Sequence, residues 1–519
     1  MEQSILGGII AHNTEGAYPW HMPGHKRRFQ TIFPDLVENP FSIDMTEVGE
    51  LDDFHHPEGI IKDALNRAAD IYGSDKSYYL VNGATCGLLA AISAVCQPGD
   101  TLIVARNCHR SVYHALRLLR LKPVYIMPEW NESLGIFGGM SADTVKKALK
   151  EHSEAKAVVL VSPTYEGVVS DIEKIAKLAH KENIPLIVDE AHGAHFEYMA
   201  NVNETISTTD YNRLPSPAIR LGADIVVESL HKTLPALTQC AILHMQGKLV
   251  NISRLEEFLS VYQSSSPSYV FMAANEACIE RMDHERDGLF IVYKQLLAEY
   301  RKKFEQLNRI HLVGEEDFKK YGIYSYDDGK LVFSVKNCGI QKEEGIWPFT
   351  GVMLSDVLAK EYGQQLEMAG GSYAVAMTSV ADSKEAFEAL YQALEVIDGQ
   401  LTDLAESADI YNEESVTYGR IPEQRMGIAE ARESHYSEVS FMEAAGRVSH
   451  TYVYLFPPGI PIVAPGEVIT REIVKELQSA LKQGLQVKGL SVTEDGEYKM
   501  TVVREHRWRS RRMRLFDKD

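Results

Sequence analysis

The chain has few cysteines, no long apolar run and no recognisable export signal. Its six cysteines, among 519 residues, form no CxxC pair and no metal-ligand spacing. We therefore expect buried free thiols in a reducing cytoplasm, and no metal site. No stretch of 18 apolar residues occurs, which argues against a membrane span. The N-terminus lacks the basic flank, apolar core and small-residue cleavage site of a secretory signal.

Basic residues are also in the minority, since the formal net charge is −20. This balance disfavours nucleic acid and anionic membranes as partners and mildly enriches cationic small molecules near the surface. The exception is the segment 504–514, which holds six arginines. We interpret it as a locally salt-bridged end rather than a nucleic-acid-binding arm.

From about residue 60 onward, short apolar runs alternate with helix-sized amphipathic segments. Such alternation predicts an α/β fold, a mostly parallel sheet with helices on both faces. The expected strands are 78–81, 101–105, 123–127, 157–162, 185–191 and 224–229, and the expected helices include 59–72, 141–152 and 171–181.

The length predicts two to four structural units. A charged helix over 285–307 would link the large unit to a smaller α/β unit, with strands at 331–335 and 373–377 and a closing helix at 383–397. The expected division is an extended, turn-rich N-terminal arm at 1–55, a large domain at 56–310, a small domain at 311–400 and a C-terminal domain at 401–519.

Polar residues of particular kinds follow several expected strands, at the edge where parallel sheets bind ligands. Gly83, Ala84 and Thr85 would open a helix and offer N–H groups and a hydroxyl to a phosphate. Asp189 ends a buried strand and requires a partner, either backbone N–H groups or a cation. A pyridinium nitrogen is such a cation, and a protonated pyridine ring is the electron sink of pyridoxal phosphate (PLP) chemistry.

Lys232 follows the next strand, with Ser229 and His231 within three positions. By position alone such a lysine is more often a surface residue with a buried stem. The order phosphate turn, acid and lysine, each after a strand, instead predicts that Lys232 holds PLP as a Schiff base. His109, just past the strand 101–105, is either structural or stacks on the flat cofactor ring.

At these residues the sequence resembles the fold-type-I Orn/Lys/Arg decarboxylases, the bacterial basic amino acid decarboxylases, over essentially the whole chain. Larger members begin with a response-regulator-like wing domain, and we expect this chain to be the shorter form without it. The motifs that carry the resemblance are MPGHK (22–26), LDDFHHPEGII (51–61), VNGAT (81–85), RNCHRS (106–111), SPTYEG (162–167), DEAHGAH (189–195), SLHK (229–232), QSSSPSY (263–269) and FPPGIPIVAPGE (456–467).

The resemblance implies a role for each matched residue. Lys232 would be the Schiff-base lysine, Asp189 the pyridinium partner, His109 the ring stacked on one cofactor face and Ala191 the contact on the other. A hydroxyl is frequent in the family where Ala84 stands, so a backbone contact is expected there. The remaining implied contacts are the phosphate cradle of Gly83, Ala84, Thr85, Ser229 and His231, a cofactor contact from His192, and a loop with Ser264 and Ser266 that reaches the neighbouring subunit's phosphate.

The implied reaction is decarboxylation of a cationic amino acid to a polyamine-pathway amine and CO2, in a homodimer or higher even-numbered oligomer with shared active sites. We rank arginine and lysine together, ahead of ornithine. Lys232 or His231 would protonate Cα, and carboxylates of LDDF (51–54) or ESHYSE (433–438) are candidates for the substrate's distal cation. The alternatives are transamination or aldol cleavage, and a non-catalytic regulator on a PLP scaffold.

Overall fold

A computed structural model describes residues 16–27, 40–49, 51–199, 215–343, 345–404, 420–455, 459–493 and 495–504. Several predictions fall wholly or partly outside the described residues. They concern residues 1–15 and 28–39 of the N-terminal arm, the arginine-rich segment beyond Arg504, and residues 456–458 of the FPPGIPIVAPGE motif.

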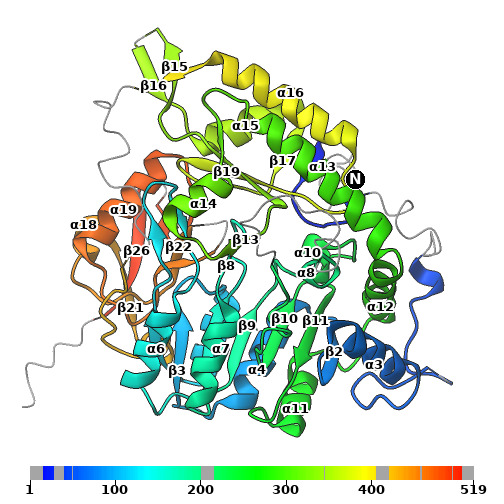
Figure 1. Ribbon diagram of the computed structural model, residues 1–519. Coiled ribbons are helices and arrows are strands. Elements are labelled where there is room, and N and C mark those ends of the chain that lie inside the picture. Colours follow the sequence, from blue (N-terminus) through cyan, green and yellow to red (C-terminus); the bar gives the residue numbers. More distant parts are fainter. Residues whose placement is uncertain are drawn as a thin grey trace, which may run out of the picture.

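A seven-stranded sheet lies at the centre of the large unit (Figure 1), in the order β2-β11-β10-β9-β7-β3-β4. The predicted, mostly parallel sheet is confirmed, because β10, β9, β7, β3 and β4 pair in parallel. The strand that sequence reasoning missed is β11, Ala241–Met245, which runs antiparallel to both of its neighbours. The other strands are β2 Lys76–Leu80, β3 Thr101–Ala105, β4 Lys122–Ile126, β7 Val158–Val161, β9 Leu186–Asp189 and β10 Ile225–Glu228.

The sheet packs on both faces, which explains its continuous apolar runs. Leu80 and Leu243 belong to one hydrophobic cluster, whereas their neighbours Tyr79 and Ile242 belong to another. Adjacent strand residues point to opposite faces, so both faces are covered. The helices around the sheet are α3 Ile60–Tyr72, α4 Gly83–Val95, α5 Arg110–Leu118, α6 Ala142–Glu151, α7 Ile172–Lys181, α8 Phe196–Met199, α10 Leu230–Thr233 and α11 Ile252–Tyr262.

A smaller unit is built on an antiparallel sheet in the order β12-β14-β19-β18. The long helix predicted over 285–307 is α13, Arg286–Phe304, and it packs against α16, Lys384–Gln400. The other elements are α12 Tyr269–His284, β12 His311–Leu312, α14 Glu315–Tyr321, β13 Ser325–Tyr326, β14 Lys330–Ser334, β15 Cys338–Lys342, β16 Gly345–Pro348, α15 Gly351–Tyr362, β17 Gln364–Leu366, β18 Met368–Ala369, β19 Tyr373–Met377 and β20 Leu401–Asp403.

The described part of the N-terminal arm lies on this smaller unit. Its strand β1, Tyr18–Trp20, pairs in parallel with β17. The Trp20 side chain is fully buried, and its indole N–H donates to Gln364 Oε1 over 2.7 Å. A 3-10 turn, η1, follows at Pro40–Ser42. Short loop strands complete this region and the large unit, namely β5 Trp130–Asn131, β6 Ile136–Phe137 and β8 Val168–Val169.

The last unit has a separate hydrophobic cluster that runs from Phe441 to Val502. Two three-stranded antiparallel sheets, β21-β26-β25 and β23-β22-β24, form it with α19. Its elements are α17 Ile428–Glu433, β21 Tyr436–Ser440, α18 Phe441–Ala444, β22 Val453–Leu455, β23 Pro461–Val463, α19 Arg471–Lys482, β24 Val487–Lys488, β25 Ser491–Val492 and β26 Tyr498–Val503.

Two expectations about composition can be compared with the structure. All six cysteines are buried and unpaired, as predicted. None of the helices in the described ranges is both long enough and apolar enough to cross a membrane. The exact domain boundaries stay a prediction.

Candidate active site

A cavity of about 230 Å³ lies at the carboxyl ends of the strands of the large sheet. It collects the predicted site residues from the loops after β2, β3, β9 and β10, with the exception of Ser264 and Ser266. The predicted residues that line it are Gly83, Ala84, Thr85, His109, Asp189, Ala191, His192, Ser229, His231 and Lys232.

One end of the cavity is formed by the N-terminus of α4. Gly83 has a left-handed φ of 76°, a conformation that favours glycine. The preceding Asn82 does not cap the helix with its side chain, and its Oδ1 instead accepts from the Ser264 N–H over 3.1 Å. The first N–H groups of α4 are thus left without a side-chain cap, as expected of an anion site.

The second wall of this end is α10, the single helical turn that carries Lys232. Its N-cap residue, Ser229, is buried and makes no capping hydrogen bond with its hydroxyl. His231 Nδ1 donates to the carbonyl of Cys240 over 2.9 Å. Burial lowers the pKa of His231 to about 4, so the ring is neutral at pH 7 and Nε2 carries the lone pair.

Lys232 also lines the cavity, and its Nζ is 3.0 Å from Nε2 of the buried His192. Burial lowers the pKa of Lys232, and the nearby Asp189 carboxylate opposes this shift. Burial also pushes the pKa of His192 well below its ordinary value. Because burial disfavours its ammonium form, Lys232 is more easily deprotonated, which is what an amine needs to attack a carbonyl.

Asp189 is buried at the end of β9, and the Ala191 N–H donates to its Oδ1 over 3.2 Å. This is the one backbone hydrogen bond found for the carboxylate among the described residues. Burial raises the pKa of Asp189, and Lys232 lowers it. One N–H does not satisfy a buried carboxylate, so the arrangement favours a cationic partner over a purely structural role.

His109 and Ala191 lie at the same cavity and offer flat or small surfaces to a ligand. The His109 Nδ1 accepts from the Ser111 N–H over 3.3 Å and lies 2.9 Å from the Ser111 hydroxyl, which fixes the ring at the start of α5. Burial lowers the pKa of His109 to about 3 and keeps the ring neutral. Ala191 has no side chain beyond Cβ to obstruct a ring.

Ser264 and Ser266 lie elsewhere, on the exposed loop before α12. The Ser264 carbonyl lies 2.9 Å from His55 Nε2, and the Ser264 hydroxyl donates to the Ser266 carbonyl over 3.3 Å. A single chain therefore does not bring these two serines to its own cavity.

The carboxylates proposed for the distal cation do not line the cavity of their own chain either. Asp52 accepts hydrogen bonds from the backbone N–H groups that open α3, including those of Gly59 and Ile61. Glu433 lies on the surface and pairs with Arg120. Asp52 is therefore held by the cap of α3, and Glu433 by a surface ion pair.

Sequence reasoning did not single out several residues of the cavity wall. Glu166 is buried, and the Tyr373 hydroxyl donates to its Oε1 over 2.8 Å. Tyr165 donates its hydroxyl to Glu367, and its ring packs 4.5 Å from that of His192. The position of SPTYEG directly after β7 is the signal that locates these two residues. The further lining residues are Leu88, Asn107, Phe137, Val161, Thr164 and Ile460.

PLP fits this cavity on its observed features. The uncapped N-terminus of α4 suits the phosphate, the under-satisfied Asp189 carboxylate suits the pyridinium nitrogen, and Lys232 lies between them on the cavity wall.

Comparisons with known proteins agree with this arrangement. The family model described as Orn/Lys/Arg decarboxylase, major domain, matches residues 5–329, and the model of the C-terminal domain matches residues 413–504. The chain belongs to the Orn/Lys/Arg decarboxylase family. It is 31% identical over 495 residues to an arginine decarboxylase of Bacillus anthracis, covering 94% of this chain and 95% of the relative.

Other members of this decarboxylase family give a consistent result. An arginine decarboxylase of Bacillus subtilis is 32% identical, and the match covers 94% of this chain and 95% of that protein. The solved structure of lysine decarboxylase A from Pseudomonas aeruginosa superposes with a TM-score of 0.72 at 20% identity. That match covers 96% of this chain and 80% of the other, and it confirms the predicted fold-type-I architecture.

Proposed function

We propose that this decarboxylase binds PLP at Lys232 and removes the α-carboxylate of a basic amino acid, with arginine as the first candidate. One observation carries the proposal. Lys232, the under-satisfied Asp189 and the uncapped N-terminus of α4 line a single cavity. Arginine comes first because the relatives that match most of the chain at 31–32% identity are named arginine decarboxylases.

Each residue of the cavity would have a definite task. When bound, PLP supplies a protonated ring that withdraws the electron pair of the breaking Cα–carboxylate bond. Asp189 holds the proton on the ring nitrogen. The N–H groups at the start of α4, with Thr85 and Ser229, hold the phosphate, and His109 and Ala191 contact the two ring faces.

Lys232 is the better of the two candidates for protonating Cα. His231 Nδ1–H is used in the hydrogen bond to Cys240, and its Nε2 carries no proton while the ring is neutral. The Lys232 amine is freed when substrate replaces it, and it carries N–H groups that can deliver a proton.

Glu166 is our candidate for the distal cation of the substrate. Together with Asp189 it is one of the two carboxylates of the described cavity lining. The Tyr373 hydroxyl donates to it, and no basic side chain of the described residues pairs with it. Burial raises the pKa of Glu166, so a guanidinium or ammonium would stabilise its charged form.

The cavity lining gives less support to the alternatives. An aminotransferase normally places an arginine on the substrate α-carboxylate, and the described lining contains none. The retained lysine, acid and histidine argue against a non-catalytic regulator. The distinguishing measurement is CO2 release against formation of pyridoxamine phosphate.

A substrate panel tests the proposal. Arginine, lysine, ornithine and the neutral norleucine are compared by kcat/KM with identification of the amine products. We expect norleucine to react at least about 30-fold more slowly than the preferred cation, because an unpaired buried carboxylate costs roughly 2–5 kcal/mol. Norleucine turnover within tenfold of arginine and lysine would refute the acidic pocket, while CO2 release from any of them would leave the decarboxylase assignment standing.

The matched variants Glu166→Gln and Tyr373→Phe locate the acidic group. The first removes the charge and should abolish the preference for a cation. The second removes the hydrogen bond to Glu166 but leaves its charge, and should keep that preference. Equal loss in both variants would assign Glu166 a structural role.

We further propose that the active unit is a cytoplasmic homodimer, or a higher even-numbered oligomer, in which Ser264 and Ser266 contact the partner's phosphate site. Their exposed loop, held next to Asn82 at the start of α4, supports this. Dilution below the dimer dissociation constant should then weaken PLP binding in parallel. A monomer that binds PLP as tightly as the oligomer would rule out the shared site.

A further inference from the structure

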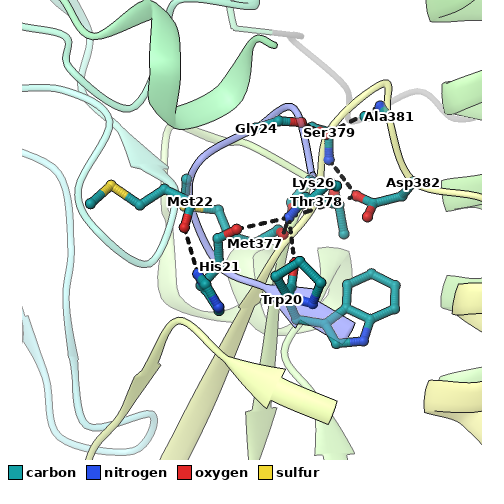
Figure 2. A network of polar contacts seen from close by, with 12 residues as sticks. Trp20, His21, Met22, Gly24, Lys26, Met377, Thr378, Ser379, Ala381 and Asp382 are labelled. Carbon is teal, nitrogen blue, oxygen red and sulfur yellow. Dashed lines mark hydrogen bonds and ion pairs between the residues drawn. The ribbon is translucent and has the colours of Figure 1, made fainter. Parts of the chain in front are cut away.

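Lys26, the last residue of MPGHK, is a buried lysine that the proposed chemistry does not use. Its side chain is 1% exposed. Figure 2 shows its ammonium enclosed by backbone: it donates to the carbonyls of Pro19 over 3.1 Å, His21 over 3.1 Å and Met377 over 2.7 Å. An ammonium has three N–H donors, so all of them are used. Lys26 is consequently not available as a second amine for a carbonyl ligand.

The same network joins the arm to the end of β19. Asp382 lies 4.0 Å from the Lys26 ammonium, and it accepts from the Tyr18 hydroxyl and from the Ser379 N–H, each over 2.7 Å. The Ser379 hydroxyl in turn donates to the carbonyl of Gly24 over 2.6 Å (Figure 2). The turn around Gly24 is thus fixed to the smaller unit on both sides.

Gly24 also contacts α10, the helix that contains Lys232. The Gly24 N–H donates to the carbonyl of His231 over 2.8 Å. A Cβ atom at Gly24 would lie 2.5 Å from the carbonyl oxygen of Leu234, closer than real Cβ contacts allow, so the arm packs backbone to backbone on α10. A single helical turn is not stable by itself and needs such external contacts.

A second contact links the arm to the cavity wall. The Met22 N–H donates to Glu367 Oε2 over 2.9 Å, and the other oxygen of Glu367 accepts from the hydroxyl of Tyr165. Tyr165 lines the cavity. The turn of residues 22–26 therefore contacts the lysine side and the tyrosine side of the same site.

We propose that Lys26 is a positioning residue for Lys232. Its ammonium donates to two carbonyls of the arm and one of β19, and these bonds hold the turn in which Gly24 contacts α10. The contact in turn fixes the backbone of α10, which carries Lys232. This inference rests on the proposed function in one respect, the assignment of PLP to Lys232. It adds that the smaller unit and the N-terminal arm determine how well Lys232 is placed.

The central experiment compares Lys26→Met with Lys294→Met. Lys294, on α13, is a matched control, because its side chain is also buried, at 8% exposure, and its ammonium pairs with Asp328 over 2.6 Å. Apoprotein is titrated with PLP, and borohydride-trapped PLP is located by peptide mass spectrometry. The pH dependence of the visible absorbance of bound PLP is recorded for each folded protein.

In Lys26→Met we expect PLP affinity to fall at least tenfold and the pH midpoint of the absorbance to move. The control should keep both within threefold of the wild type, even where its unfolding temperature is lower. A folded Lys26→Met protein with PLP affinity and absorbance profile within threefold of the wild type would overturn the proposal.

Ser379→Ala keeps the experiment decisive if Lys26→Met does not fold. It removes the hydrogen bond to the Gly24 carbonyl and the one that the Ser379 hydroxyl accepts from the Ala381 N–H, and it leaves Lys26 itself unchanged. We expect a loss in PLP affinity of threefold or more, and an affinity within threefold of the wild type would overturn the positioning role. Trapping at Lys232 in the wild type is checked first, so that its failure refutes the cofactor assignment and not the role of Lys26.

Discussion

At the scale of single residues, Lys232 and Asp189 each hold a charge that burial disfavours. Burial lowers the pKa of the lysine and raises that of the aspartate, and each partly restores the charge of the other. Without a ligand, the Lys232 ammonium is the cation that stabilises the Asp189 carboxylate. A ligand that takes the lysine as an imine must therefore supply a new cation to Asp189, which a pyridinium does.

Lys232→Ala should abolish turnover and borohydride trapping of PLP while leaving the fold intact, because the amine both holds the cofactor and releases the product. Far-UV circular dichroism and peptide mass spectrometry check the two parts. Lys248→Ala, at an exposed lysine after β11, is the control. Near-wild-type decarboxylation by Lys232→Ala would show the central assignment to be wrong.

Asp189→Asn should still bind PLP but lose at least roughly 100-fold in kcat, or about 2.7 kcal/mol of transition-state stabilisation. The amide cannot keep the ring nitrogen protonated, although it preserves the shape of the side chain. Steady-state kinetics at saturating PLP measure the loss. A decrease of less than threefold would assign Asp189 a structural role.

At the scale of elements, a second pair of acidic residues lies at the ends of β9 and β10. Glu190 directly follows Asp189, the last residue of β9, and Glu228 is the last residue of β10. Glu228 of β10 is fully buried, and burial raises its pKa to about 8, with Glu197 adding to the shift. Burial and the neighbouring Glu228 push the pKa of Glu190 upward as well. His244 lies 3.9 Å from Glu228 and is kept neutral by burial, so it does not balance the charge.

This pair makes the stability of the fold depend on pH. Between about pH 4.5 and 8 the folded protein keeps a proton on Glu228 that the unfolded chain releases, so stability falls as the pH rises through this window. One such proton contributes up to about 1.4 kcal/mol per pH unit. Glu228→Gln should flatten the decline in urea-unfolding free energy between pH 6 and 8, whereas Glu257→Gln, at an exposed site on α11, should not. Parallel pH profiles for all three proteins would contradict the assignment.

The same elements indicate how far sequence reasoning reaches. Strands buried on both faces, such as β3 and β10, are visible as short apolar runs, and residues just after them line one cavity. The run Ala241–Met245 has the same composition, but the direction of a strand depends on its connections, so antiparallel β11 was missed. Ile460 lies in the FPPGIPIVAPGE motif, but the motif does not indicate that this residue reaches the cavity, because its place there depends on how the C-terminal unit docks.

At the scale of the whole molecule, one buried ion pair joins the C-terminal unit to the active-site edge of the large sheet. Arg106, after β3, donates to both oxygens of Glu467 over 2.7 and 2.9 Å, and to the Ile462 carbonyl over 3.2 Å. The Arg106 guanidinium also lies 4.8 Å from the ring centre of Tyr125. The loop that bears Ile460 is thereby held against the cavity.

Arg106→Met should destabilise the protein by about 3–5 kcal/mol, because it leaves the Glu467 carboxylate buried and unpaired. The double variant Arg106→Met, Glu467→Met should recover most of this loss. Arg120→Met removes a pair with Glu433 between the same two units, but that pair is exposed and its loss should cost no more than about 1 kcal/mol. Denaturant unfolding compares the three. A double variant no more stable than Arg106→Met would contradict the explanation by an uncompensated charge.

The contact between Lys26 and Met377 has a consequence for biosynthesis, because it spans 351 residues of sequence. On the ribosome the arm is made first, and its partner on β19 follows about 20 to 70 s later at ordinary elongation rates. Until then the nascent chain already carries the phosphate turn, Asp189 and Lys232, but nothing yet presses Gly24 onto α10. A translation product that stops before β19 would hold the phosphate turn, Asp189 and Lys232, and would still lack the Met377 carbonyl through which we propose that Lys26 positions Lys232.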